Sequence, residues 1–291
     1  MQIVLHVGAH CTDEGQLVTT LARNRDDFLA RGVSVPSPVR YRVLIREALH
    51  ALENGPPAED ARDILLDAIL EDDEADRVIL SNENFFGMPR MSMSDGQFYP
   101  TAEQRIADFR QLFPGDQIEL FLGMRDPGTF IPAVHAQSTG VALERVLNGS
   151  DPRELRWSRL IERIKGVAPD MPVTVWCNED TPLIWAQIIR EMAGLEPETK
   201  IKGGFDLLHA ITSEEGMRRF RSYLDTHPEM SEAQKRRVIT AFLDKYALEE
   251  EIEEELDMPG WTEELVERMT ALYDADVEII RAMPGVSLIA P

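Results

Sequence analysis

The chain has 291 residues, a formal net charge of −22 and an apolar fraction of 43%. This length is enough for one large core, or for one core with a helical appendage. The excess of acids repels polyanions, so we expect neither nucleic acid nor an anionic membrane as a partner.

The compartment is indicated by three further features. No apolar run is long enough to cross a membrane, and the chain opens directly on a strand-like pattern without a signal peptide. Two cysteines, Cys11 and Cys177, do not make a disulfide framework. We therefore expect a cytoplasmic protein.

Short apolar runs rich in β-branched residues predict four strands, separated by helical patterns. The expected strands are Gln2–Val7, Arg77–Leu80, Gln117–Met124 and Pro172–Cys177. The expected helices are Tyr41–Leu52, Ala58–Leu70, Ala102–Phe113, Pro127–Thr139, Leu155–Val167 and Thr181–Met192. This alternation predicts an α/β fold, with a parallel sheet covered by helices on both faces.

From about Phe205 onward the pattern is helical, and helices are expected at Ser213–Leu224, Ser231–Tyr246 and Trp261–Met283. We therefore expect an α/β domain over residues 1–204 and a helical C-terminal region over residues 205–291 that packs on it. Residues 249–257 contain seven acids, which predicts a solvated helix face.

The segment from His6 to Gln16 links the first predicted strand to a helical pattern. A strand, a turn and a helix in this order direct free helical N–H groups toward a phosphate or sulfate. A lysine in the loop normally supplies positive charge, but Cys11 stands at that place and the acids Asp13 and Glu14 follow it. The first lysine of the chain is Lys165.

Ligands of parallel sheets gather beyond the carboxyl ends of the strands. Four loops are therefore expected around one crevice: Gly8–Gly15, Ser81–Phe86, Arg125–Gly128 and Asn178–Asp180. Arg125 follows a buried strand and needs an anionic partner, either a ligand or an internal acid such as Asp126 or Glu83.

Taken in order, these loops resemble the bacterial branch of the sulfotransferase superfamily. Members begin with a strand and His-Ile-Gly-x-x-Lys-Thr-Gly-Thr-Thr, which corresponds to residues 6–15 here. Residues 32–36, Gly-Val-Ser-Val-Pro, and the segments Ser81-Asn82-Glu83 and Arg125-Asp126-Pro127 match further family motifs. The likeness spans most of the chain and implies a three-layer parallel sheet of the P-loop type.

The resemblance also implies an activity, the transfer of a sulfuryl group from 3′-phosphoadenosine 5′-phosphosulfate to a small-molecule or glycan acceptor. Glu83 would be the general base that takes the acceptor's proton. The residues implied to bind the donor are Gly8, Cys11, Thr12, Gly15, Gln16 and Arg125.

Three departures from the family pattern weaken donor binding. Cys11 replaces the lysine, Asp13-Glu14 replaces Gly-Thr, and Ala133 replaces a serine. A lost charge-assisted hydrogen bond to phosphate costs about 1.5–3 kcal/mol, and one like-charge pair at roughly 5 Å costs about 3 kcal/mol. The donor would need other cations, for which the candidates are Arg40, Arg42, Arg90 and the Lys200–Lys202 turn.

Three hypotheses follow. The chain is a sulfotransferase-like enzyme, a non-catalytic binding or accessory protein that keeps the fold, or a transferase with a different donor. The spacing of His6, His10 and Cys11 is not that of a zinc site, so we expect no metal. The long connection around Met88–Met93 is a candidate lining of an acceptor pocket.

Overall fold

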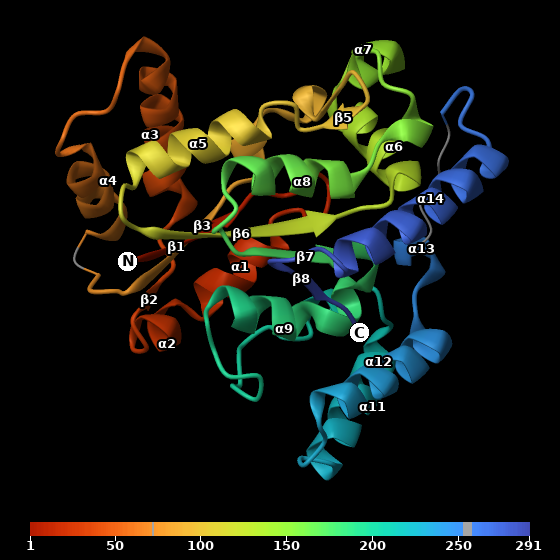
Figure 1. The fold of residues 1–291 in the computed structure, drawn as a ribbon. Helices are drawn as coiled ribbons and strands as arrows, with labels where there is room; N and C mark the ends of the chain where they lie inside the picture. Colours follow the sequence, from red (N-terminus) through yellow and green to blue (C-terminus); the bar gives the residue numbers. More distant parts are fainter. Residues whose placement is uncertain (72, 253–257) are drawn as a thin grey trace.

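The computed structural model describes residues 1–71, 73–252 and 258–291. Its centre is a six-stranded sheet of order β2-β3-β1-β6-β7-β8, in which every neighbouring pair of strands is parallel (Figure 1). The strands are β1 (Gln2–His6), β2 (Val33–Ser34), β3 (Arg77–Ser81), β6 (Gln117–Met124), β7 (Val173–Cys177) and β8 (Val286–Ile289). The predicted α/β fold with a parallel sheet is confirmed.

Helices cover both faces of the sheet and enclose two apolar cores. The larger core lies under α3 (Pro38–Ala51), α4 (Ala61–Leu70), α5 (Ala102–Leu112), α6 (Pro127–Gln137), α8 (Trp157–Val167) and α14 (Glu263–Arg281). The smaller core lies under α1 (Gln16–Arg23), α2 (Arg25–Leu29) and α9 (Thr181–Met192). The helices bury most residues of the central strands on both faces, which is why these strands are mostly apolar in sequence.

The C-terminal region forms a helical extension and then returns to the sheet. Its helices are α10 (Asp206–Ala210), α11 (Glu214–Thr226), α12 (Glu232–Tyr246) and α13 (Glu249–Ile252). Leu208, Met217, Phe220 and Ile239 give this extension a small core of its own. In Figure 1, α11 and α12 project below α9, whereas α14 runs back along the sheet toward β8.

Several elements were not predicted. β2 has two residues and β8 has four, too few to give a recognisable alternating pattern. These two strands form the edges of the sheet. The hairpin of β4 (Met93–Ser94) and β5 (Gln97–Phe98) and the helix α7 (Leu143–Leu147) are equally short. Of the acidic run, Glu249–Ile252 is an exposed helix and residues 253–257 lie outside the described part. No helix in the described part of the chain has the length and apolar character needed to span a bilayer.

Trp157 links the core to the carboxyl end of β6. Its side chain has no exposed surface and stacks on Phe98 with ring centroids 4.0 Å apart. Its Nε1–H donates to the carbonyl oxygen of Arg125 at 2.9 Å. The residue therefore supports the backbone from which Arg125 extends.

We predict that Trp157→Ala lowers the free energy of unfolding by about 3–5 kcal/mol, because it leaves a large cavity and an unpaired carbonyl group. Urea unfolding measures this loss. Trp157→Phe, which keeps most of the apolar volume, should lose clearly less. A loss below about 1 kcal/mol for the alanine variant would contradict the role given to this side chain.

Candidate functional site

The carboxyl ends of β1 and β3 border a cavity of about 390 Å³, which we call the loop cavity. His6 at the end of β1 pairs in register with Ser81 of β3 and with Phe121 of β6. The cavity is lined by His6, Cys11, Asp13, Glu14, Gly15, Val18, Arg42, Ser81, Glu83 and Gln137. The predicted convergence of the first two loops, Gly8–Gly15 and Ser81–Phe86, is therefore present.

Backbone pairing holds the β1–α1 loop against the neighbouring strand. The N–H of Ala9 donates to the carbonyl of Gly123, and the N–H of Gly123 donates to the carbonyl of Gly8, both at 2.7 Å. Gly8 has a φ of +105°, and a Cβ there would lie 3.1 Å from the nitrogen of His10 and 3.5 Å from Glu83. Glycine is thus required both by the backbone conformation and by the close approach of Glu83.

The first turn of α1 has an internal anionic partner. The N–H of Leu17 donates to Oδ2 of Asp13 at 2.8 Å, and the N–H of Gln16 donates to the carbonyl of Asp13 at 2.7 Å. A carboxylate at this place satisfies free helical N–H groups and complements the positive end of the helix dipole. Asp13 therefore accepts the hydrogen bonds that the first turn of α1 would otherwise donate to a bound phosphate or sulfate.

Arg125 contacts the loop from the end of β6 without lining the loop cavity. Its Nη1 donates to the carbonyl oxygen of Cys11, and its Nε donates to Oγ1 of Thr129 at 3.0 Å. The third predicted loop, residues 125–128, thus also meets the first. The fourth meets the third, because the N–H of Asp126 donates to Oε1 of Glu179 at 2.8 Å.

The charges in the loop cavity are mainly negative. Asp13, Glu14 and Glu83 contribute carboxyl groups, and burial raises the pKa of Glu83, which the nearby Asp13 raises further. Arg42 is the one arginine among the lining residues, and its Nε and Nη2 donate to the carbonyl of Ser81 at 3.1 and 3.0 Å. Burial lowers the pKa of His6, so this ring adds no positive charge at neutral pH.

The other residues predicted to bind the donor lie around the cavity in different ways. Cys11 and Gly15 line it, whereas Oγ1 of Thr12 donates to the carbonyl of Ala9 at 2.8 Å. Gln16 is an exposed residue at the start of α1 and is not among the lining residues. Of the six residues predicted to bind the donor, Cys11 and Gly15 therefore line the cavity.

Of the cations proposed to replace the lysine, only Arg42 reaches the loop cavity. Arg40 pairs with Glu71 at 2.7 Å, and Lys202 pairs with Asp27 at 2.9 Å. Arg90 is exposed and does not line the cavity. The sequence indicated Arg42 only as one of several candidates, because the direction of α3 relative to β3 cannot be read from the chain.

His10 is buried behind the loop in a polar network. Its backbone N–H donates to the hydroxyl of Tyr99 at 3.0 Å, and its Nδ1 lies 2.8 Å from the same oxygen. Its Nε2 lies 3.4 Å from Oδ1 of Asn84. Burial lowers the pKa of His10 to about 4, so the ring is a neutral structural group at neutral pH.

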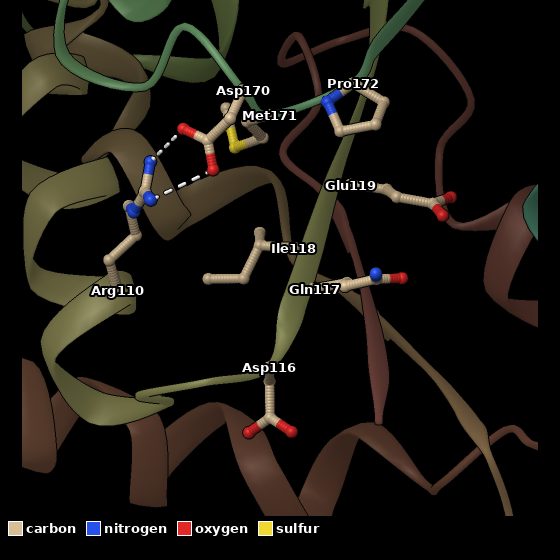
Figure 2. A pocket seen from close by; sticks show the side chains of 8 residues that line it. All are labelled: Arg110, Asp116, Gln117, Ile118, Glu119, Asp170, Met171 and Pro172. Carbon is tan, nitrogen blue, oxygen red and sulfur yellow. Dashed lines mark hydrogen bonds and ion pairs between the residues drawn. The ribbon is translucent and has the colours of Figure 1, made fainter.

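A second cavity lies at the opposite, amino end of the strands and is shown in Figure 2. Arg110 and Asp170 form a double hydrogen bond there, at 2.7 and 3.0 Å. Asp116 is paired with Arg62 and with the N-terminal amine. Since these charges already have partners, this cavity offers little to a charged ligand.

Among the described residues, no group of three or more His, Cys, Asp or Glu side chains is arranged to hold a metal ion.

Comparison with known proteins finds distant likenesses among solved structures. No protein-family model matches the chain, and no curated protein matches it. Among solved structures, a sulfotransferase from Alicyclobacillus acidocaldarius is similar over 82% of this chain and 97% of that chain, with 14% identity and a TM-score of 0.38. A likeness of this size carries no argument about the site, which has to be interpreted from its own residues.

We predict that the protein loses stability as the pH falls from about 6.5 to about 4. A histidine with a lowered folded-state pKa contributes stability above its unfolded pKa, near 6.5, and loses it as protonation drives unfolding. The loss attributable to His10 is up to about 3 kcal/mol at pH 4.

Urea unfolding at several pH values, together with an NMR titration of the His10 ring, tests this prediction. His10→Gln should reduce the pH dependence in this range, although part of it persists because the pKa of His6 is also lowered. A midpoint for the His10 ring near 6.5 would contradict the assignment.

Proposed function

We propose that this chain is a sulfotransferase-like protein that does not use 3′-phosphoadenosine 5′-phosphosulfate. We propose further that its loop cavity binds a ligand carrying an amine or another hydrogen-bond donor. The observation that carries this proposal is the 2.8 Å hydrogen bond from the N–H of Leu17 to the carboxylate of Asp13.

The residues present do not fit the 5′-phosphosulfate group of that nucleotide. An incoming anion would have to displace Asp13 from α1, at a cost of about 0.5–2 kcal/mol for a lost helix cap. The anion would also lie close to the carboxyl groups of Asp13, Glu14 and Glu83. Among the described residues that line the cavity, Arg42 is the arginine that could offset them. At roughly 5 Å each like-charge pair costs about 3 kcal/mol, so repulsion outweighs one arginine.

The same charges favour the opposite class of ligand. A primary amine or a polyhydroxyl compound can donate hydrogen bonds to carboxylates, and hydrogen bonds between charged groups are the stronger ones. Gln137 at the end of α6 and Ser81 add neutral polar groups to the wall. A binding or accessory role needs nothing more than these groups.

A second candidate function is favoured by one observation. Glu83, whose pKa is raised by burial, lies in the same cavity as Cys11 and Gly15 of the loop. A carboxylate with a raised pKa suits a general base, which supports a transferase that uses this base on an acceptor hydroxyl. This second candidate includes sulfuryl transfer, provided that Arg42 binds the donor in place of the missing lysine.

We predict that 3′-phosphoadenosine 5′-phosphate leaves the unfolding midpoint unchanged within about 1 °C up to millimolar concentration. A functional site at a hundred times its dissociation constant gains about 2.7 kcal/mol, which shifts the midpoint by roughly 5 °C or more. The measurement is thermal unfolding at low and moderate salt. A saturable, salt-sensitive rise of the unfolding midpoint, seen also in the Glu83→Gln variant, would favour the transferase hypothesis instead.

We also predict that Cys11→Lys combined with Asp13→Gly and Glu14→Thr creates nucleotide binding. The triple variant removes the internal carboxylate and adds three units of positive charge at the loop, which should raise the affinity at least about a hundredfold. Glu53→Lys with Glu59→Gln is the matched control, because it changes the net charge equally at exposed residues of the α3–α4 connection. Equal nucleotide binding by both variants would sink the role assigned to Asp13.

A further inference from the structure

A third cavity, of about 360 Å³, opens between α3, α5 and the connection of two short 3₁₀ turns, Glu83–Phe86 and Pro89–Met91. We call it the arginine groove. Arg42 and Arg46 line it from α3, and Arg105 lines it from α5. Its volume is near the lower end of the range typical of small-molecule sites.

The arginine groove has a charge opposite to that of the chain. The protein carries a net charge of −22, yet no Asp or Glu of the described ranges 1–71, 73–252 and 258–291 lines this groove. Arg42 and Arg46 are four residues apart on one helix, so their side chains lie on the same face. Three guanidinium groups therefore gather in one groove of a protein whose net charge is strongly negative.

These arginines are only partly neutralised by the protein. Arg105 lies 3.5 Å from Asp108, and Arg42 donates to the carbonyl of Ser81. Within the described part of the chain, Arg46 has neither an ion pair nor a side-chain hydrogen bond. A planar guanidinium without a competing carboxylate is well suited to a carboxylate or sulfate.

Beside the arginines and two asparagines, Asn82 and Asn84, the groove is lined by apolar side chains, several of which are exposed. Val43, Met88 and Met91 are 49%, 53% and 46% exposed, and all three line it. Methionine side chains are flexible and adapt to apolar ligands of different shapes. A ligand that covers these side chains would gain hydrophobic free energy in addition to its ion pairs.

We propose that the arginine groove binds a single-chain anionic amphiphile, with its carboxylate or sulfate head at Arg46 and Arg105 and its alkyl chain over Met88, Met91 and Val43. This site is distinct from the loop cavity, with which it shares only Arg42. The inference goes beyond the proposed function and does not depend on what the loop cavity binds.

The test is isothermal titration of the whole protein with decanoate below its micellar concentration. Arg46→Gln should weaken decanoate binding about tenfold, the value of one charge-assisted hydrogen bond. Arg40→Gln is the matched control, because it removes the same charge from the same helix but from a residue paired with Glu71 outside the groove. The control should change the affinity less than about twofold.

Three further arms of the experiment decide the ligand class. Octanoate should bind more weakly than decanoate, by about fourfold for each methylene that is buried. Decyltrimethylammonium should not compete, and vesicles containing phosphatidylglycerol should not capture the protein through Arg46.

Equal losses for the two arginine variants, or equally tight binding of the cationic amphiphile, would overturn the proposal. Arg46-dependent capture by vesicles would overturn it in favour of a membrane lipid.

Discussion

The parallel register of β1 with β3 and β6 determines where the β1–α1 loop lies relative to Glu83. His6 is the last residue of β1 and pairs with strands on both sides, so the following chain must pass between their carboxyl ends. There Gly8 and Ala9 continue the pairing toward Gly123 while Gly8 lies against Glu83. This constraint brings the β1–α1 loop to Glu83 whatever charge the loop carries.

The charge of the loop is therefore free to change without a change of fold. In the structure the positive end of α1 is balanced by Asp13, and the loop itself carries no cation. The guanidinium of Arg42 enters the loop cavity from α3, on the far side of Ser81. The carboxylate of Asp13 therefore supplies from within the chain the negative charge that complements this helix end.

The sequence was sufficient to predict the elements that depend on long apolar runs. β1, β3, β6 and β7 and the longer helices α3, α4, α5, α6, α8 and α9 were predicted at or near their observed positions, because long apolar patterns give a strong signal. β2 and β8 were not predicted, since strands of two and four residues are defined by their neighbours rather than by their own pattern. The approach of the loops Gly8–Gly15 and Ser81–Phe86 to one cavity followed from strand order alone.

The positions of the polar and charged side chains around the two cavities could not be predicted in the same way. Arg42 was one of several possible cations, and Arg46 and Arg105 carry no local motif at all. They meet because α3 and α5 cover the same face of the sheet, which depends on tertiary packing. The same reason explains why Gln137, at the far end of α6, was not expected in the loop cavity.

The two neighbouring cavities differ in what an anion would have to displace. At the loop cavity an anion competes with Asp13 for the N–H groups of α1 and meets two further carboxyl groups. At the arginine groove the described structure places no acid on the wall, and Arg46 has no side-chain competitor there. Since electrostatic selectivity is the difference between these two costs, anion recognition is favoured in the groove and disfavoured at the loop. Of these two cavities, the arginine groove on α3 and α5 therefore carries the positive charge, and the loop cavity carries the carboxyl groups.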